Sequence, residues 1–482
     1  MALHVYDRFT GAKKKFEPVR PGKVGMYVCG MTVQDQPHVG HMFAFVACDM
    51  IRRYLEFLGY EVTHVQNFTD IDDKIIAKAQ AEGVDYRVVA ERNMALYHAA
   101  AGALRLLPAH QYPLATENID GIIDYTRKLI TSGHAYAVDG DVYFDVRSYD
   151  DYGRLSGRHV DDMRAGARVE VGEKKRDPLD FALWKASRPG EPAWDSPWGP
   201  GRPGWHIECS VMATRYLGEH FDFHGGGQDL LFPHHENERA QSCAATGSHF
   251  VNYWLHNGLL YLGGSKMSKS DGNFFAMADV LAKVRPEIVR FFLLNAHFRS
   301  HLDYSEERLQ ETAAAYDRLA RGVGRLLAAL AADVAPVPAG LVSAQGEILA
   351  KQVRDHRRRF FAALDDDFNS GGAIGELFAL VRDLNQYHAA AGETVRDEAI
   401  LAQARVLLQE ADRILGLFPG GLASCLEEMD EAPAEIRRLA VEREAARRDR
   451  DWAQADTLRA QIQAQGWLVE DGPQGSVLRR RG

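Results

Sequence analysis

The 482-residue sequence lacks the features of membrane, secreted and bulk nucleic-acid-binding proteins. No run approaches the roughly 18 uncharged apolar residues of a membrane span, and the N-terminus has no apolar core of signal-peptide length. The five cysteines are few, scattered and odd in number, which excludes a disulfide framework. An excess of basic charge is also absent, because 57 Lys and Arg stand against 67 Asp and Glu, for a net charge of −10. We therefore expect a cytoplasmic protein with reduced thiols, no membrane contact, and only local basic surfaces for a polyanion.

The composition is that of a large globular protein. Hydrophobic residues make up 46% and charged residues 26% of the chain, which excludes wholesale disorder. At roughly 100 to 200 residues per domain, the length indicates about two to four domains.

The first hundred residues alternate short apolar strands with helical spacing. Residues 25–30 indicate a strand that ends in Gly30, and apolar residues recur at helical spacing from 45 to 58, where Gly59 stops the pattern. Residues 62–65 then indicate a second strand. This order predicts an α/β fold with a Rossmann-like parallel sheet, which binds ligands beyond the carboxyl ends of its strands. Cys29, Gly30 and residues 67–70 would lie at that edge.

Later changes in pattern divide the rest of the chain. A hairpin-like segment at 138–142 lies in an insertion, and 187–204, with five prolines and four glycines, is expected to be a long ordered loop. A composition shift at 333–338 separates helical segments, and the charged, helical tail ends in a strand candidate at 467–469. The predicted units are an α/β domain in two halves, an insertion, a helical bundle and a small C-terminal domain, with bounds 1–110 and 196–304, 111–195, 305–425 and 426–482.

Two motifs indicate nucleotide chemistry. His38-Val39-Gly40-His41 lies between the first strand and its helix, where free N–H groups, a glycine and imidazoles suit a phosphate. By itself such a turn is more often merely exposed. Lys266-Met267-Ser268-Lys269-Ser270 follows two glycines, and its lysines could close on a triphosphate. Together and in this order, the motifs resemble the two signature sequences of class I aminoacyl-tRNA synthetases.

A third motif suggests a metal site. His234 and Glu238 are four residues apart, which would place them on one face of a helix begun by Pro233, with His235 pointing elsewhere. Cys29 and Cys209 could complete a donor set suited to zinc, although spacing alone cannot reveal that set.

Longer segments narrow the resemblance to the cysteinyl-tRNA synthetase family. The matching segments span nearly the whole chain, at residues 25–30, 69–74, 204–210, 224–238, 288–294, 365–369 and 468–475. The resemblance implies one Zn²⁺ per chain, held by Cys29, Cys209, His234 and Glu238, which binds the thiolate of L-cysteine and so rejects serine. It also implies an amino-acid pocket formed by Gly30, Thr69, Trp205, His224 and Asp229.

The same resemblance implies a two-step reaction. L-cysteine and ATP, with Mg²⁺, would form cysteinyl-adenylate, and the cysteine would then pass to the 3′ end of tRNA(Cys). The catalytic residues would be His38, His41, Lys266 and Lys269, and ATP would also contact Gly40, Met267, Ser268 and Ser270. A monomer is expected, with an anticodon-binding C-terminal domain.

Three alternatives remain at this point. A related ligase of mycothiol biosynthesis joins cysteine to an amino sugar through the same chemistry, but it lacks an RNA-binding extension such as the one with Trp452 and Arg459. A zinc hydrolase fits two cysteine ligands poorly, and a non-catalytic tRNA-binding relative would need damaged signatures. The chain departs from the family pattern at positions expected on the pocket rim, namely Gln34, Met42, Phe43 and Asp271.

Overall fold

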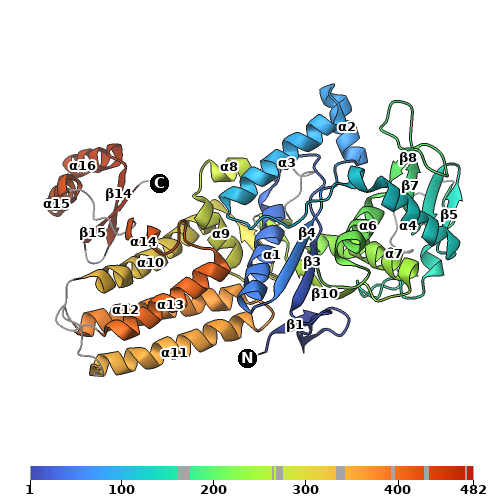
Figure 1. Cartoon of the computed structure of the whole chain (residues 1–482). Coiled ribbons are helices and arrows are strands. Elements are labelled where there is room, and N and C mark those ends of the chain that lie inside the picture. The colour runs from blue at the N-terminus through green and yellow to red at the C-terminus, as the bar shows by residue number, and fades with distance from the viewer. Residues whose placement is uncertain are drawn as a thin grey trace.

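The computed structural model describes residues 2–160, 174–262, 265–266, 275–332, 342–391, 397–427, 434–472 and 475–480. These residues form an elongated molecule (Figure 1). A central α/β unit lies between an insertion with its own sheet and a helical bundle, and a small C-terminal unit follows the bundle. Within the described part of the chain, no helix combines the length and apolarity needed to cross a bilayer.

Four parallel strands form the central sheet, in the order β10-β9-β3-β4. Their bounds are Lys23–Val28 for β3, Glu61–Gln66 for β4, Phe221–Gly227 for β9 and Val251–Asn257 for β10. Strands β3 and β9 are neighbours although the insertion separates them in the sequence. The predicted parallel sheet is confirmed.

Helix α1 (Val39–Phe57) connects β3 to β4 and packs almost wholly within the core. It ends before Gly59, whose φ of +91° lies in the region that favours glycine, so the predicted stop is confirmed. The same core continues from the sheet through α1 into the helical bundle, since Val28, Met50 and Leu407 belong to one buried cluster. The central α/β unit and the bundle therefore share one hydrophobic core.

Smaller elements surround this sheet. The hairpin β1 (His4–Asp7) and β2 (Ala12–Lys15) precedes it, and α2 (Asp73–Glu82) and α3 (Tyr86–Ala103) follow β4. After β10 come β11 (Leu260–Leu262), β12 (Ser265–Lys266), α8 (Met277–Leu281), α9 (Pro286–Leu294) and β13 (Leu302–Tyr304). Strands β12, β11 and β13 form a separate three-stranded sheet in that order.

The insertion contains α4 (Ile119–Thr131) and an antiparallel sheet. Its strands, in order across the sheet, are β5 (Ala135–Val138), β6 (Asp141–Phe144), β7 (Phe181–Ala186) and β8 (Gly201–Pro203). The hairpin predicted at 138–142 is confirmed. The prediction that 187–204 is entirely loop is wrong, because β8 pairs with β7; an edge strand tolerates Pro203 there. Helices α6 (Trp205–Leu217) and α7 (Glu236–Thr246) return to the central unit.

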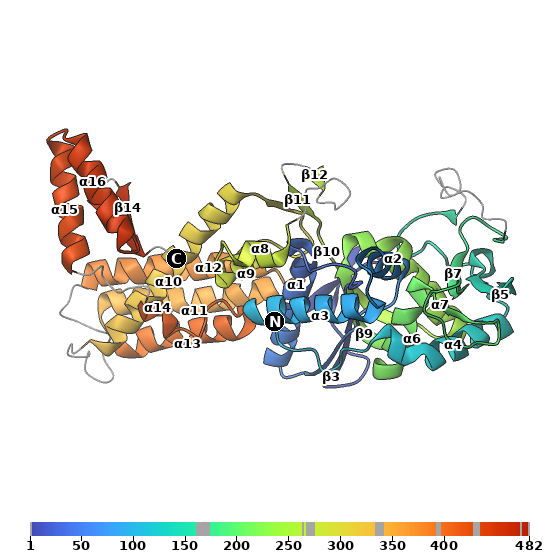
Figure 2. The same ribbon diagram turned by 90° about the horizontal axis from the view of Figure 1, so that it is seen from above.

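The bundle and the C-terminal unit have separate cores. The bundle consists of α10 (Glu306–Ala331), α11 (Ala344–Leu364), α12 (Ser370–Ala391), α13 (Glu398–Leu415) and the short α14 (Ser424–Glu427). The linker predicted at 333–338 lies outside the described residues. The C-terminal unit, which stands out from the bundle in Figure 2, contains α15 (Ala434–Arg448), α16 (Trp452–Ala464), β14 (Trp467–Gly472) and β15 (Gly475–Arg480). The strand predicted at 467–469 is confirmed, whereas β15 was not predicted.

A buried arginine ties α9 to its surroundings. The Arg290 guanidinium is fully buried and donates to Asp49 Oδ2 of α1 at 2.6 Å. It also donates to the carbonyl oxygens of Leu104 at 2.9 Å and Leu415 at 2.8 Å, at the ends of α3 and α13. This one side chain therefore fixes how the bundle meets α1.

Candidate functional site

A pocket of about 330 Å³ lies at the carboxyl ends of the parallel strands. Its wall brings together Cys29 and Gly30 after β3, Thr69 after β4, and the turn that starts α1. Trp205 of α6 and Asp229, just past β9, also line it. The predicted position of a ligand site, beyond the carboxyl edge of the sheet, is thus the position of this pocket.

The turn at 38–41 forms the N-terminus of α1. His38 is the capping residue, with its Nδ1 accepting the backbone N–H of His41 at 3.1 Å, while His41 Nδ1 accepts the backbone N–H of His38 at 3.4 Å. The two rings stack with centroids 3.5 Å apart. Because both Nδ1 atoms accept hydrogen bonds, each neutral ring carries its proton on Nε2, a donor suited to a phosphoryl oxygen. His38, Gly40 and His41 all line the pocket.

The second nucleotide motif is only partly described. Lys266 ends β12, and its backbone pairs with Tyr261 of β11. Met267, Ser268, Lys269, Ser270 and Asp271 lie outside the described residues. Their role in ATP binding stays a prediction.

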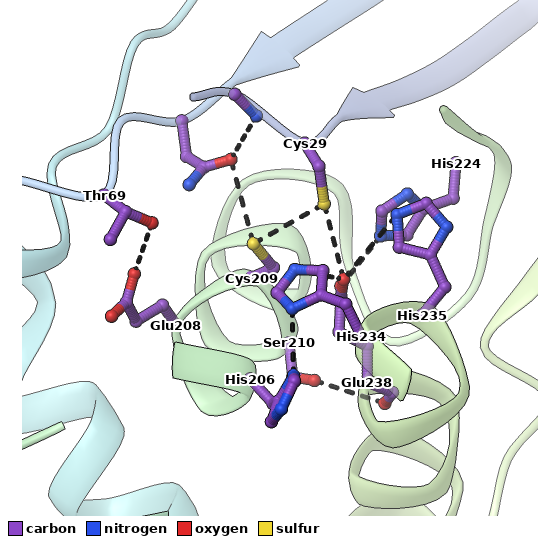
Figure 3. A network of polar contacts seen from close by, with 12 residues as sticks. Cys29, Thr69, His206, Glu208, Cys209, Ser210, His224, His234, His235 and Glu238 are labelled. Atoms are coloured by element: carbon purple, nitrogen blue, oxygen red, sulfur yellow. Dashed lines mark hydrogen bonds and ion pairs between the residues drawn. The ribbon is translucent and has the colours of Figure 1, made fainter. Parts of the chain in front are cut away.

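Four buried donors from separate elements converge at the base of the pocket (Figure 3). The Sγ atom of Cys29 lies 3.6 Å from Sγ of Cys209 and 3.3 Å from Oε1 of Glu238. Nε2 of His234 lies 3.0 Å from the same oxygen. Ligands held tetrahedrally at zinc bond lengths lie about 3.3 to 3.8 Å apart, so the donor types and most of these spacings suit a zinc ion.

The pKa values in this cluster favour the charged forms of Cys209, Glu238 and His234 and the neutral form of Cys29. The hydrogen bond from Cys29 lowers the pKa of Cys209 to about 6. Burial raises the pKa of the Cys29 thiol well above its usual value. Burial opposes the charge on Glu238, yet His224 and His234 hold its pKa well below the usual range. Burial likewise disfavours a charged His234, but Glu238 and Cys209 raise its pKa to about 10. A bound cation would replace the proton on His234 as the partner of these anionic groups.

Two histidines lie differently from their prediction. His224 was expected in the amino-acid pocket, but it is fully buried behind the cluster, where its Nε2 is 2.8 Å from Glu238 Oε2 and its ring stacks on Trp254. His235 was expected to point elsewhere, but its Nε2 is 4.0 Å from Glu238 Oε1. His224 and His235 form, with Cys29 and Glu238, a second set of donors that could hold a metal.

The inward position of His235 follows from the backbone conformation just before α7. Helix α7 starts at Glu236, and Pro233 lies in the preceding element, residues 231–235, which is kinked at Phe232 (φ −143°, ψ 130°). His235 keeps helical angles up to α7, so His234 and Glu238 still meet as their four-residue spacing predicts. The turn formed by 231–235 carries both His234 and His235 inward. Helical spacing predicted that His234 and Glu238 meet, but not the inward position of His235.

The remaining predicted pocket residues differ in their surroundings. Trp205 is 37% exposed, and its ring stacks on His234 with centroids 4.3 Å apart. Thr69 is buried and donates through Oγ1 to Glu208 at 2.7 Å. Asp229 faces the pocket at the turn after β9. The site can therefore offer a carboxylate, a hydroxyl and an indole to a small ligand beside the metal donors.

Two side chains beside the site had no predicted role, although the segment 67–70, which includes Asn67, was expected at this edge of the sheet. Asn67 Oδ1 accepts the backbone N–H of Gly30 at 2.9 Å and lies 3.8 Å from Sγ of Cys209. His206 Nδ1 lies 2.9 Å from Nδ1 of His234. Their positions in polar segments directly after β4 and at the start of α6 are the signal that could have indicated them.

Comparison with known proteins agrees with this geometry. Residues 15–314 match the model of the tRNA synthetases class I (C) catalytic domain, and residues 359–419 match the DALR domain. A cysteine–tRNA ligase of Geobacter sulfurreducens is 50% identical over 486 residues, covering 99% of each chain. Another from Thioalkalivibrio sulfidiphilus is 50% identical and covers 99% of this chain and 100% of the relative.

Solved structures share the fold at low sequence identity. A methionyl-tRNA synthetase of Mycobacterium tuberculosis has a TM-score of 0.63 and 16% identity, covering 85% of this chain and 95% of that one. A LeuRS of Agrobacterium radiobacter K84 has a TM-score of 0.63 and 11% identity, covering 87% of this chain and 86% of that one. These likenesses show the fold alone, and the full-length relatives show the family to which the chain belongs. The chain belongs to the cysteine–tRNA ligase family of class I tRNA synthetases.

Proposed function

We propose that this protein activates L-cysteine with ATP and transfers it to the 3′ end of tRNA(Cys). The observation that carries the proposal is one pocket that joins the His38–His41 turn to two cysteines, a histidine and a glutamate. A phosphate-binding turn beside soft metal donors suits a reaction between ATP and a thiol-bearing substrate.

Zn²⁺, one per chain, would be held by Cys29, Cys209, His234 and Glu238, and when bound it supplies a soft partner for the substrate thiolate. Asp229 is suited to the substrate ammonium, and Thr69 and Trp205 to the walls around it. The difference between sulfur and oxygen as zinc partners would then separate cysteine from serine without an editing site.

His38 and His41 would donate through Nε2 to phosphoryl oxygens while the cysteine carboxylate attacks the α-phosphate of ATP. Lys266 and Lys269 would stabilise the pyrophosphate that leaves, together with Mg²⁺. A ribose hydroxyl at the 3′ end of tRNA would then attack the activated carbonyl, releasing AMP. Gly40, at the start of α1, lets a phosphate approach the backbone N–H groups.

We further propose a cytoplasmic monomer, because tRNA charging takes place where the ribosomes work and each chain contains a whole site. The division into units at 1–110, 111–195, 196–304, 305–425 and 426–482 belongs to the same proposal, except that β8 (Gly201–Pro203) extends the sheet of the insertion past residue 195. Sedimentation of the purified protein tests the monomer, and metal analysis tests the ratio of one zinc per chain.

Cysteine-dependent exchange of pyrophosphate into ATP, followed by charging of tRNA with radioactive cysteine, tests the activity. We expect both reactions with zinc-loaded protein. Exchange without charging of tRNA, but with transfer to an amino sugar, would favour the mycothiol-type ligase. Absence of exchange would contradict the proposal.

A further inference from the structure

One lysine on the pocket wall has no role in the site described so far. Lys74 lies at the second position of α2, is exposed, and lines the same pocket as His38, Gly40 and His41. Among the described residues that line this pocket, it is the one Lys or Arg. No ion pair is found for it within the described part of the chain, whereas Lys78, one turn later, pairs with Asp35.

The backbone that carries Lys74 is anchored on both sides. Asp72 caps α2 by accepting the backbone N–H of Lys74 at 2.9 Å. Asp73 accepts hydrogen bonds from Lys185 at 2.7 Å and from Arg202, both in the sheet of the insertion. The backbone that carries Lys74 is therefore held in place at the wall of the pocket.

The nearby carboxylates do not account for the lysine. Asp73 is already paired with two cations of the insertion, and Asp70 accepts hydrogen bonds from the backbone N–H and hydroxyl of Thr116. A lysine in the first turn of a helix also opposes the positive end of the helix dipole. The exposed ammonium therefore gains nothing from the helix dipole, whereas an anion that enters the pocket gains a cation to pair with.

We propose that Lys74 binds a phosphate group of a nucleotide in the pocket, either of ATP or of the terminal nucleotides of tRNA. The inference rests on the proposed function and adds a cation to it that is separate from the two lysines of the 266–270 motif. Both sources present the same chemistry, a phosphate oxygen that accepts a charge-assisted hydrogen bond from Nζ.

The test compares Lys74→Met, Lys74→Arg and the matched control Lys78→Met in the full-length, zinc-loaded protein. Pyrophosphate exchange is measured against ATP concentration, and charging is measured against tRNA concentration at several salt concentrations. Thermal unfolding and zinc content establish that each variant is folded and loaded. Wild-type exchange and charging test the proposed function separately from the role of Lys74.

If the phosphate is that of ATP, Lys74→Met raises the KM for ATP in exchange by about tenfold or more, the size of one charged hydrogen bond. If it belongs to tRNA, exchange is unchanged, kcat/KM for tRNA falls by a similar factor, and the dependence on log salt falls by about one unit. In either case Lys74→Arg keeps most of the activity and Lys78→Met resembles the wild type.

Two results would overturn the proposal. The first is a folded Lys74→Met variant whose ATP and tRNA parameters both stay within about twofold of the wild type, since a charged contact is expected to exceed that. The second is a Lys74→Arg variant as defective as Lys74→Met, because the positive charge would then not be what matters.

Discussion

At the scale of single residues, the clearest prediction concerns the Cys209 thiol of the cluster. Cys209→Ser replaces a soft donor with a hydroxyl of similar size, which is a poor zinc ligand. We expect zinc occupancy and the preference for cysteine over serine to fall together, each by about tenfold or more. Metal analysis and exchange assays with both amino acids measure the two quantities.

Cys243→Ser is the matched control, because Cys243 is only partly buried and belongs to neither donor set. That variant should keep both zinc and selectivity. Unchanged zinc content and unchanged serine rejection in Cys209→Ser would refute the proposed role of the metal.

A buried histidine in the sheet predicts sensitivity to acid. His64 of β4 is buried, and neither of its ring nitrogens has a hydrogen-bond partner among the described residues. Burial, reinforced by Arg52, lowers its pKa to about 3. The native ring therefore stays neutral, while the unfolded chain takes up a proton below its ordinary pKa of about 6.5. Stability contributed by the neutral ring is present above that pH and is lost as the pH falls towards 3.

His64→Leu should reduce this loss. Between pH 7 and pH 5 the free energy of unfolding of the wild type should fall by up to about 2 kcal/mol more than that of the variant. Urea denaturation at the two pH values measures the difference. An equal pH dependence in both proteins would show that another group is responsible.

The sequence could identify donor types more readily than their partners. Gly30 was predicted as the end of a strand and as a pocket residue. The sequence could not show that the backbone of Asn67 lies so close that a β-carbon at position 30 would be 1.6 Å from its carbonyl oxygen. His224 was placed in the pocket by its neighbouring glycines and by resemblance. In the structure the hydrogen bond to Glu238, fourteen residues away, places its ring behind the cluster instead.

At the scale of elements, Arg290 is the main link between α9, α1 and α13. Arg290→Met would leave Asp49 buried with fewer partners, and breaking such a pair typically costs about 3 to 5 kcal/mol. Asp49 keeps Arg53 and the backbone N–H of Leu107, so we expect the lower end of that range. Urea denaturation of the single variant and of Arg290→Met combined with Asp49→Asn measures the effect, and the double variant should recover part of it.

The control is Arg87→Met, which removes an exposed pair with Asp85 and should leave the free energy of unfolding almost unchanged. If Arg290→Met destabilises no more than Arg87→Met, the buried arginine does not hold these helices together.

Periodicity predicted long elements well and short ones poorly. The strand at 62–65 and the helix ending before Gly59 were visible because apolar spacing extends over whole turns or alternations. Strand β8 was not, since three residues with a proline carry no pattern, and its pairing with β7 is a tertiary contact. The inward turn at 231–235 likewise depends on the extended conformation of Phe232.

At the scale of the whole molecule, the C-terminal unit has its own core of Ile436, Leu439, Ala440, Leu458, Ile462 and Val469. A chain ending at residue 430 should therefore retain cysteine-dependent exchange. Charging of tRNA should fall by about tenfold or more in kcat/KM, because the basic α15 and the exposed Trp452 would be lost.

Full-length Trp452→Ala is the companion variant. The indole is 58% exposed and lies under the Arg447 guanidinium at 5.8 Å, an arrangement that suits stacking with a base. It should share part of the loss in charging. A truncated chain that loses exchange as well would show that the C-terminal unit supports the catalytic pocket.

The net charge argues against binding of nucleic acid through bulk attraction, but it does not show how charge is distributed along the chain. The chain carries −10 in total, yet residues 431–482 contain ten arginines and nine acidic residues, so the last segment is slightly basic. The order of domains could be predicted from changes in pattern along the chain. The continuous core that runs through α1 into the bundle could not be predicted, because it depends on contacts between helices that are far apart in the sequence.

The spread of the four donors along the chain has a consequence for biosynthesis. Cys29 is 180 residues from Cys209 and 209 residues from Glu238. At about 5 to 20 residues per second, the ribosome needs on the order of 10 to 40 s to make the partners of the first thiol. During that interval Cys29 is exposed to oxidants and competing metals on the nascent chain, so correct metal loading depends on how well the cell protects that thiol.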